Sequence, residues 1–412
     1  MKKVLIVGFV WPESVTTAAG GRMMQLIRFF KAENYHITFA STAAKTIYSN
    51  DLSAMGVCEK EIQLNNASFD AFILDLNPDI VLFDRFLTEE QFGWRIAQNS
   101  PNALRILDTE DLHFLRTARE KGFKNENRTV TEHDLKAQDI TKREVASIYR
   151  CDFSLIISSY EMEILQVTFG IAKELLLLLP FMLDGIDSAT TAKWNKSTER
   201  TGFVCIGNGK HKPNVDAVLW LYTVIWPKIR ATLPKASVFI YGAYLPQQIK
   251  EKHNPKLGFF VEGWTNEITD VLLKARVNLA PLRFGAGIKG KLIDGMRTGL
   301  PSVTTDIGAE GMHGNLPWGG EIAPDLESFV SAAITLYTNE ELWLAAQKKG
   351  MEIHNKYYSR TILETKLSNK ISTLQKGLQK HRNKNFIGSM LLHHSMASTK
   401  YLSKYIQEKA NK

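Results

Sequence analysis

The sequence predicts an α/β protein with two doubly wound parallel-sheet domains of the Rossmann type and a helical C-terminal tail. Short buried runs typical of strands alternate with longer stretches of helical periodicity, the order that parallel sheets require. One polar, aperiodic stretch at 184–202, rich in Ser and Thr, interrupts the alternation. With 412 residues, 44% of them hydrophobic, the chain can form two cores. We therefore expect domains at 1–183 and 203–360, a linker at 184–202 and a tail at 361–412.

The expected strands fall into two sets, one in each domain. In the first domain they are 4–7, 36–41, 80–83, 104–107, 153–157 and 175–179. In the second domain they are 203–206, 237–241, 259–261, 277–280 and 302–305. Binding groups of such sheets gather at the carboxyl ends of the strands, and a cleft between two α/β domains is a usual place for a small-molecule site.

The charge balance separates the body of the chain from its tail. The net charge is +8, but from Lys366 onward the chain has ten Lys or Arg residues against Glu408 alone, so the rest is near neutral. A nucleic-acid-binding protein usually carries its basic residues on the working domain, so this distribution argues against that class. No apolar run approaches the roughly 18 residues of a spanning helix, and the first residues lack a signal-peptide pattern. Three widely spaced cysteines, Cys58, Cys151 and Cys205, predict a reduced, cytoplasmic protein.

The end of the tail combines apolar residues with lysines. The apolar residues are Phe386, Ile387, Met390, Leu391, Tyr401, Leu402, Tyr405 and Ile406. A basic amphipathic segment of this kind could rest on an anionic membrane surface. A disordered tail, or one that binds a partner, fits the pattern equally well.

The loop after the first expected strand, at 8–19, lacks the Gly-x-Gly-x-x-Gly pattern of a dinucleotide site. It ends in Gly20 and Gly21, ahead of an expected helix. Two glycines at a helix start suit the close approach of a ligand to backbone N–H groups. A plain tight turn explains them as well.

A polar cluster follows the strand that ends at Leu107. Residues 108–116 contain three carboxylates and His113. Asp111 and His113, just after a buried strand, suit proton handling or the binding of sugar hydroxyls. The alternative is that Asp108, Thr109 or Asp111 caps the following helix and His113 is packed or solvated.

The stretch 283–312, RFGAGIKGKLIDGMRTGLPSVTTDIGAEGM, is the most specific part of the sequence. A glycine-rich turn with Gly285 and Gly287 leads into a short helical pattern. The N–H groups of such a turn point outward and suit an anion such as a phosphate. Lys289 and Lys291 add positive charge at the same place.

Asp294 belongs to the same helical pattern. It lies three positions after Lys291, so both side chains share a helix face. A surface ion pair between them is therefore the alternative to a binding role.

This stretch resembles the donor-binding segment of the retaining family 4 glycosyltransferases (glycosyltransferase group 1). Their GT-B fold has two Rossmann-like domains facing each other across a cleft. Many members carry Glu-x7-Glu here; Asp294 stands where the second Glu would be, and Ala286 where the first would be. The Gly-x-Gly-x-Lys-x-Lys pattern from Gly285 resembles one branch of the family, and the resemblance covers about residues 1–360 in order.

The resemblance implies that the second domain binds a nucleotide diphosphate sugar, with the glycine turn and Lys291 around it. It implies that Asp294 holds the ribose and that Lys289, with Lys210 or Lys212, faces the diphosphate. Lys210 and Lys212 could equally be solvated lysines of a polar loop. Glu310 would face the sugar or stabilise its loop.

The same resemblance gives a role to the polar cluster of the first domain. Similar Asp-Thr-x-Asp-Leu-His-x-x-Arg segments lie at the interdomain cleft in a branch of the family, which implies that Asp111 and His113 act in catalysis together with Lys289. The implied acceptor is a glycan, a lipid-linked molecule or a protein, bound by the first domain. The fold needs neither a metal nor a cofactor besides the donor, and its last helices cross back to the first domain.

The expected function is therefore sugar transfer to a hydroxyl acceptor with retention, in bacterial-type glycan or polysaccharide biosynthesis, in the cytoplasm or on the cytoplasmic face of a membrane. Two alternatives share this architecture. One is a nucleotide-sugar epimerase of the non-hydrolysing type. The other is a non-catalytic protein that binds a nucleotide sugar or a partner, which the absence of the first Glu, at Ala286, suggests.

Overall fold

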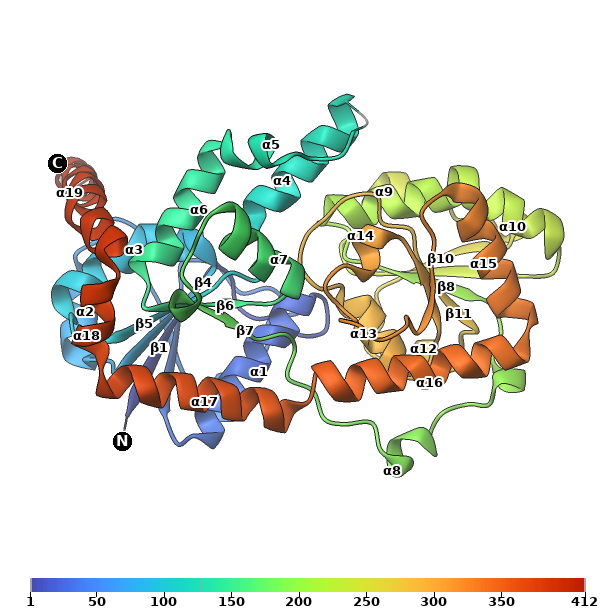
Figure 1. The fold of residues 1–412 in the computed structure, drawn as a ribbon, viewed down its shortest axis with the longest axis horizontal. Coiled ribbons are helices and arrows are strands. Elements are labelled where there is room, and N and C mark those ends of the chain that lie inside the picture. Colours follow the sequence, from blue (N-terminus) through green and yellow to red (C-terminus); the bar gives the residue numbers. More distant parts are fainter. Residues whose placement is uncertain (1, 127, 411–412) are drawn as a thin grey trace. The chain divides into compact units, whose positions relative to one another are not determined.

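The structure, a computed structural model, describes residues 2–126 and 128–410 (Figure 1). The chain forms two compact units. The first consists of Met1–Phe114, Val130–Phe181 and Ile362–Lys412, and the second of Leu115–Thr129 and Met182–Thr361.

The first unit contains a seven-stranded parallel sheet of order β3-β2-β1-β4-β5-β6-β7. Its strands are β1 Lys3–Gly8, β2 His36–Ser41, β3 Cys58–Glu61, β4 Ile80–Asp84, β5 Leu104–Asp108, β6 Phe153–Ile156 and β7 Leu176–Leu178. Six of them confirm the strands expected from the sequence. The edge strand β3 was not expected, because its sequence Cys-Glu-Lys-Glu lacks a buried face. Charged residues on an edge strand prevent pairing with other chains.

Helices flank this sheet. They are α1 Ala18–Ala32, α2 Ser68–Leu76, α3 Arg85–Asn99, α5 Glu132–Lys136, α6 Asp139–Arg150 and α7 Ser159–Glu163. Helix α4, His113–Lys121, begins in the first unit and ends in the second.

The second unit contains a six-stranded parallel sheet of order β10-β9-β8-β11-β12-β13. Its strands are β8 Phe203–Ile206, β9 Val238–Tyr241, β10 Phe259–Gly263, β11 Val277–Ala280, β12 Ser302–Thr304 and β13 Gly320–Ile322. Its helices are α8 Ser188–Thr191, α9 Lys212–Trp220, α10 Trp226–Thr232, α11 Gln247–Lys250, α12 Ile268–Lys274, α13 Gly290–Arg297, α14 Asp306–Ala309, α15 Leu326–Thr338 and α16 Glu340–Tyr357. Both sheets confirm the expected pair of doubly wound α/β folds.

The core of the second unit joins its sheet to its helices. Phe203 of β8 packs edge-on against Trp226 of α10, with ring centroids 5.8 Å apart, and Phe329 of α15 is fully buried in the same cluster. The indole N–H of Trp226 donates to Leu257 O at 2.7 Å, so its polar atom is satisfied inside the core. Such packing holds the strand ends, and hence the loops after them, in place.

The tail is helical and, from Ile362 onward, belongs to the first unit. Its helices are α17 Arg360–Lys376, α18 Leu378–Lys384 and α19 Phe386–Ala410. Arg382 binds both carboxylate oxygens of Asp152, at 2.7 and 2.8 Å, at the start of β6. No helix in the described ranges is both long and apolar enough to cross a membrane.

Candidate functional site

The order of strands in the second sheet reverses between β8 and β11. Open α/β sheets bind ligands at such a switch point, beyond the carboxyl ends of the strands. The loops there are 207–211 after β8 and 281–289 after β11. The second loop contains the glycine turn that the sequence singled out, and it leads into α13.

Glycines allow the loops at this edge to touch backbone to backbone. A Cβ added at Gly209 would lie 2.3 Å from Tyr244 O, and one added at Gly242 would lie 1.9 Å from Gly207 O. Any larger residue would separate the loops after β8 and β9. In the loop after β11, Gly287 adopts the left-handed region, with φ +66.

Two lysines lie where this loop meets α13. Lys289 occupies the N-cap position of α13, and its Nζ donates to Gly287 O at 2.5 Å and to Ala286 O at 3.3 Å. Lys291 Nζ donates to Asn214 Oδ1 at 2.6 Å, on the helix that follows the β8 loop. Burial lowers the pKa of the Lys291 ammonium, and no carboxylate of the described chain contributes to that shift. The hydrogen-bond partner of Lys291 is thus a neutral amide.

Two carboxylates near this edge, Asp216 and Asp294, are paired with arginines. Arg283 binds Asp216 at 2.6 and 2.9 Å. Asp294 lies 3.5 Å from Arg297, so the alternative of an ion pair with Lys291 is wrong: Arg297 takes that place. Because acidic groups are neutralised by arginines, Lys289 and Lys291 give the start of α13 a positive potential.

Glu310 is also paired, by a residue that the sequence did not indicate. Arg119 donates to both oxygens of Glu310 at 2.7 Å and to Gly285 O at 2.9 Å. Both side chains are nearly buried. The guanidinium therefore ties the glycine turn after β11 to the segment after β12.

Arg119 belongs to a short segment, Leu115–Thr129, that packs in the second unit. Phe123 stacks on Phe284 with ring centroids 5.4 Å apart, and Glu120 accepts from Lys212 Nζ at 2.8 Å. The partners are separated from this segment by more than ninety residues in sequence, so no local pattern could have revealed them.

The structure brings together Gly285, Gly287, Lys289, Lys291 and Glu310 around one loop. Lys210 lies in the neighbouring β8 loop, exposed, with its Nζ 3.6 Å from the centroid of the Tyr244 ring. Asp294 lies on the second turn of α13 and is about half exposed.

The first unit has its own switch point, between β1 and β4. Asp84 and Asp108 end the adjacent strands β4 and β5 and lie side by side in register. Arg22 from α1 clasps Asp108 with hydrogen bonds of 2.8 to 3.0 Å. Asp84 accepts the N–H of Phe9, the residue after β1, at 3.0 Å.

Two residues just beyond these strands have left-handed backbones that only glycine adopts easily. They are Arg85, with φ +69, and Glu110, with φ +63. Such strain costs about 1–3 kcal/mol for each residue and concentrates at functional sites. Burial, and next Asp108, raise the pKa of the Glu110 carboxyl well above its usual range, since the site holds more carboxylates than arginines.

His113 and Asp111 lie close together at this edge. His113 Nε2 is 3.5 Å from Asp111 Oδ1, and the imidazole packs edge-on against Phe86. The backbone N–H groups of His113 and Phe114 donate to Glu144 at 3.1 and 3.0 Å. Burial raises the pKa of Glu144 to about 8.

Glu161 accepts the N–H of Leu112 at 3.0 Å, which agrees with a structural role for this residue. Carboxylates from α6 and α7 therefore receive the N–H groups at the beginning of α4. These long-range partners hold His113 and Asp111 in place.

Gly20 and Gly21 lie in the first turn of α1. The N–H of Gly20 donates to Thr17 Oγ1 at 2.9 Å, and that of Gly21 donates to Thr17 O at 3.1 Å. A Cβ at Gly20 would lie 2.4 Å from Glu13 O, whereas one at Gly21 would meet open space. The close approach at Gly20 is therefore made by the chain's own loop.

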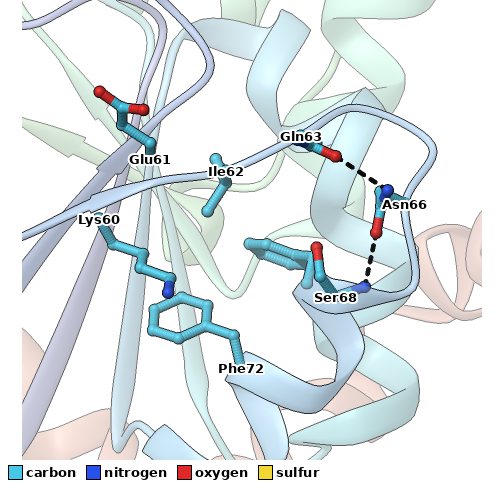
Figure 2. A pocket seen from close by; sticks show the side chains of 8 residues that line it. Lys60, Glu61, Ile62, Gln63, Asn66, Ser68 and Phe72 are labelled. Carbon is cyan, nitrogen blue, oxygen red and sulfur yellow. Dashed lines mark hydrogen bonds between the residues drawn. The ribbon is translucent and has the colours of Figure 1, made fainter.

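A hollow of about 390 Å³ lies elsewhere in the first unit, beside edge strand β3 (Figure 2). It is lined by Lys60, Glu61, Ile62, Gln63, Asn66, Ser68, Phe69 and Phe72. The side-chain amide of Asn66 already has partners within the chain, because it donates to Gln63 and accepts the N–H of Ser68. It does not coincide with either switch point. Across the described ranges, no group of three or more His, Cys, Asp or Glu residues could hold a metal ion.

Comparison with known proteins agrees with this geometry. Residues 200–339 match the family model described as "Glycosyl transferases group 1". Sucrose-phosphate synthase from Thermosynechococcus elongatus has a similar structure, with a TM-score of 0.66 and 11% identity over 91% of this chain and 99% of that one. The fold is that of the GT-B glycosyltransferases.

Three more GT-B proteins are similar. Anabaena HepE in complex with UDP and glucose has a TM-score of 0.64 and 12% identity, over 91% of this chain and all of that one. WaaG, a glycosyltransferase involved in lipopolysaccharide biosynthesis, has a TM-score of 0.61 and 13% identity, over 89% of this chain and 99% of that one. A mutant of S. aureus TarM, with UDP bound, is 14% identical with a TM-score of 0.57; the match covers 73% of this chain but 58% of TarM. Comparison with curated protein sequences finds no match.

Proposed function

We propose that the protein is a glycosyltransferase that transfers a sugar from a nucleotide diphosphate donor to a hydroxyl acceptor. One observation carries the proposal: Lys289 and Lys291 both lie at the start of α13, at the switch point of the unit that contains the group 1 match. The N-terminus of a helix with two lysines suits a diphosphate, because both supply positive potential. HepE and TarM, whose folds are similar, have UDP bound in their structures.

In this mechanism the lysines act on the leaving group. As the bond between sugar and diphosphate breaks, negative charge develops on the departing diphosphate oxygen. Lys289 and Lys291 would stabilise it more than they stabilise the bound donor, which is how such groups accelerate a reaction. Asp294 would accept a hydrogen bond from the ribose, and Glu310, held by Arg119, would lie next to the sugar.

The acceptor is proposed to bind at the carboxyl edge of the first unit. A carboxylate-rich edge can accept hydrogen bonds from hydroxyl groups, and His113 with Asp111 can take up the proton of the reacting hydroxyl. Positioning of that hydroxyl against the anomeric carbon supplies a further part of the rate.

The finer parts of the proposal concern chemistry and setting. We propose transfer with retention, as in family 4, without a metal, in glycan or polysaccharide biosynthesis. Similarity to WaaG, a glycosyltransferase of lipopolysaccharide biosynthesis, supports that setting. The free cysteines Cys58, Cys151 and Cys205 favour a cytoplasmic location. The basic tail from Lys366 onward favours peripheral attachment to a membrane.

The decisive experiment measures release of the nucleoside diphosphate from a panel of nucleotide sugars, with and without glycan acceptors. Acceptor-dependent release that is lost in Lys289→Ala and kept in Lys256→Ala, an exposed lysine, supports the proposal. Retention of activity in EDTA tests metal independence, and the anomeric configuration of the product tests retention.

Two results would redirect the proposal. Interconversion of donor sugars without an acceptor would indicate the epimerase. Donor binding without turnover on any acceptor would indicate a non-catalytic nucleotide-sugar protein. If no nucleoside diphosphate or nucleotide sugar raises the melting temperature, the donor site itself is wrong, since a ligand that binds the folded state alone must stabilise it.

A further inference from the structure

Helix α19, Phe386–Ala410, is fixed to the first unit along one side. Near its start, Asn385 Nδ2 donates to Tyr149 O at 2.7 Å, and a Cβ at Gly388 would lie 2.2 Å from the same oxygen. Near its end, Arg95 Nη2 donates to Ser403 Oγ at 3.1 Å. The helix therefore packs against α6 and α3 (Figure 1), and these contacts determine which side of it points outward.

The outward side of α19 is apolar. We call five residues its outer face, each between 45% and 70% exposed: Phe386, Ile387, Met390, Tyr401 and Tyr405. At about 100° per residue, these five lie within an arc of about 100°. Buried Gly388 and Ser403 lie on the opposite side. Leu402, also exposed, lies about 60° beyond one edge of this arc and widens the apolar surface there.

Lysines flank the outer face. By the same helical spacing, Lys400 and Lys404 lie along one border and Lys409 along the other. Glu408 is the single acidic residue of the 386–410 sequence. An apolar stripe with basic borders is the pattern of a helix that lies in a membrane interface.

We propose that the outer face of α19 docks on an anionic lipid surface. Its aliphatic and Phe side chains would enter the boundary between headgroups and acyl chains. The two tyrosines would sit at headgroup level, where aromatic rings with a polar end are favoured. The lysines would approach lipid phosphates, each adding to binding at an anionic surface.

The lysines also favour a lipid surface over a second copy of the chain. A twofold dimer places the same face against itself, which brings like charges together across the interface. An anionic bilayer neutralises those charges instead. The inference goes beyond the proposed sugar transfer and does not depend on it.

The test uses the full-length protein and unilamellar vesicles in flotation assays. Vesicles of phosphatidylcholine with one third phosphatidylglycerol should bind the protein, and pure phosphatidylcholine should not. Binding should weaken on the order of tenfold between 0.05 and 0.5 M salt, because salt screens the lysines. Equal binding to both kinds of vesicle would overturn the proposal.

Variants locate the surface. The pair Tyr401→Ser and Tyr405→Ser, and the pair Lys404→Glu and Lys409→Glu, should each lower vesicle binding about tenfold or more. Matched controls on α16, Leu342→Ser with Leu344→Ser and Lys348→Glu with Lys349→Glu, should bind as the parent does. Circular dichroism and an unchanged melting temperature establish that each variant is folded, and neither measurement relies on the proposed function.

Other results would refute the lipid surface. If the tyrosine or lysine pair binds vesicles as the parent does, the outer face is not the docking surface. If the protein binds no vesicles and forms a dimer that the tyrosine pair abolishes, a second copy occupies the face.

Discussion

The two units have similarly wound parallel sheets, but the carboxyl edges of those sheets differ in their ionisable side chains: lysines at the second, buried carboxylates at the first. In the second unit, arginines neutralise Asp216, Asp294 and Glu310, while Lys291 keeps a neutral amide partner. In the first unit, the buried carboxylates around Asp108 outnumber their arginine partners, and the pKa values of Asp84 and Glu110 are raised.

This difference shows that the architecture does not decide what each edge binds. In both units the order of the strands places loops at a switch point. The side chains on those loops determine which kind of ligand the edge of the sheet favours. A diphosphate suits the lysine edge. A carboxylate-rich edge suits hydroxyl groups, and this difference is the basis of the division of donor and acceptor that we propose.

The largest effect should come from variants that remove the charged side chains from one edge at a time. The double variant Lys289→Ala, Lys291→Met should weaken binding of a nucleoside diphosphate by roughly 100-fold or more, since hydrogen bonds to charged groups contribute about 1.5–3 kcal/mol each. Asp111→Asn and His113→Gln should leave that binding unchanged and lower turnover instead. Isothermal titration with UDP and other diphosphates measures the first effect, and steady-state kinetics measures the second. Similar loss of binding in both sets would show that the edges do not have separate roles.

Glu144 gives the first unit a pH dependence of its own. Its folded pKa of about 8 lies above the unfolded value near 4.3, so the folded carboxyl keeps a proton that the unfolded chain has lost. Its contribution to stability is therefore full at low pH and falls as pH rises from about 4.3 to 8. Between pH 6 and 8 the free energy of unfolding of the parent should fall by about 2 kcal/mol relative to that of Glu144→Gln.

Urea denaturation of parent and variant at each pH measures this difference. Glu163→Gln, at an exposed position of α7, is the matched control, and its stability should run parallel to that of the parent. The groups that face Glu144 are the N–H groups of His113 and Phe114, which lower its pKa, and Asp111 and Glu161, which raise it. A constant difference between parent and Glu144→Gln across the pH range would contradict the assignment.

His354 should give the second unit the opposite dependence. Burial lowers its pKa to about 4, below the unfolded value near 6.5, so the folded imidazole stays neutral where the unfolded one gains a proton. Its contribution is full above pH 6.5 and is lost as pH falls towards 4. From pH 7 to 5 the free energy of unfolding of the parent should fall by about 1.8 kcal/mol relative to that of His354→Gln. His133→Gln, an exposed histidine, should show no such difference in the same denaturation series.

Much of the fold followed from the sequence because buried runs and helical periods are local. Strands such as β4 and β5 are wholly buried, so their apolar runs stand out. Strand β3 has no buried face, and its pairing with β2 is what makes it a strand. The glycine turn and Lys289 were found because they are neighbours in the chain.

The partners that shape the two edges were not predictable in this way. Arg119 and Glu310 are 191 positions apart, and Glu144 caps an N–H group 31 positions before it. Neither helical nor strand periodicity carries information about such pairs, since only the folded chain brings them together. The left-handed backbone of Glu110 likewise depends on its surroundings, because sequence alone favours glycine or asparagine there.

The smallest expected effect concerns Arg119. This residue joins the glycine turn after β11, at Gly285, to the segment after β12, at Glu310. Arg119→Lys keeps the positive charge but loses the planar guanidinium, which donates to both oxygens of Glu310 and to Gly285 O at the same time. The loss should be about 1 kcal/mol, so amide exchange in the segment Leu115–Thr129 should become roughly fivefold faster. Hydrogen exchange measured by mass spectrometry follows this segment directly, and Arg128→Lys, exposed in the same segment, is the control. Unchanged exchange in Arg119→Lys would mean that charge alone holds the segment, and that the lysine edge does not need the geometry of the guanidinium.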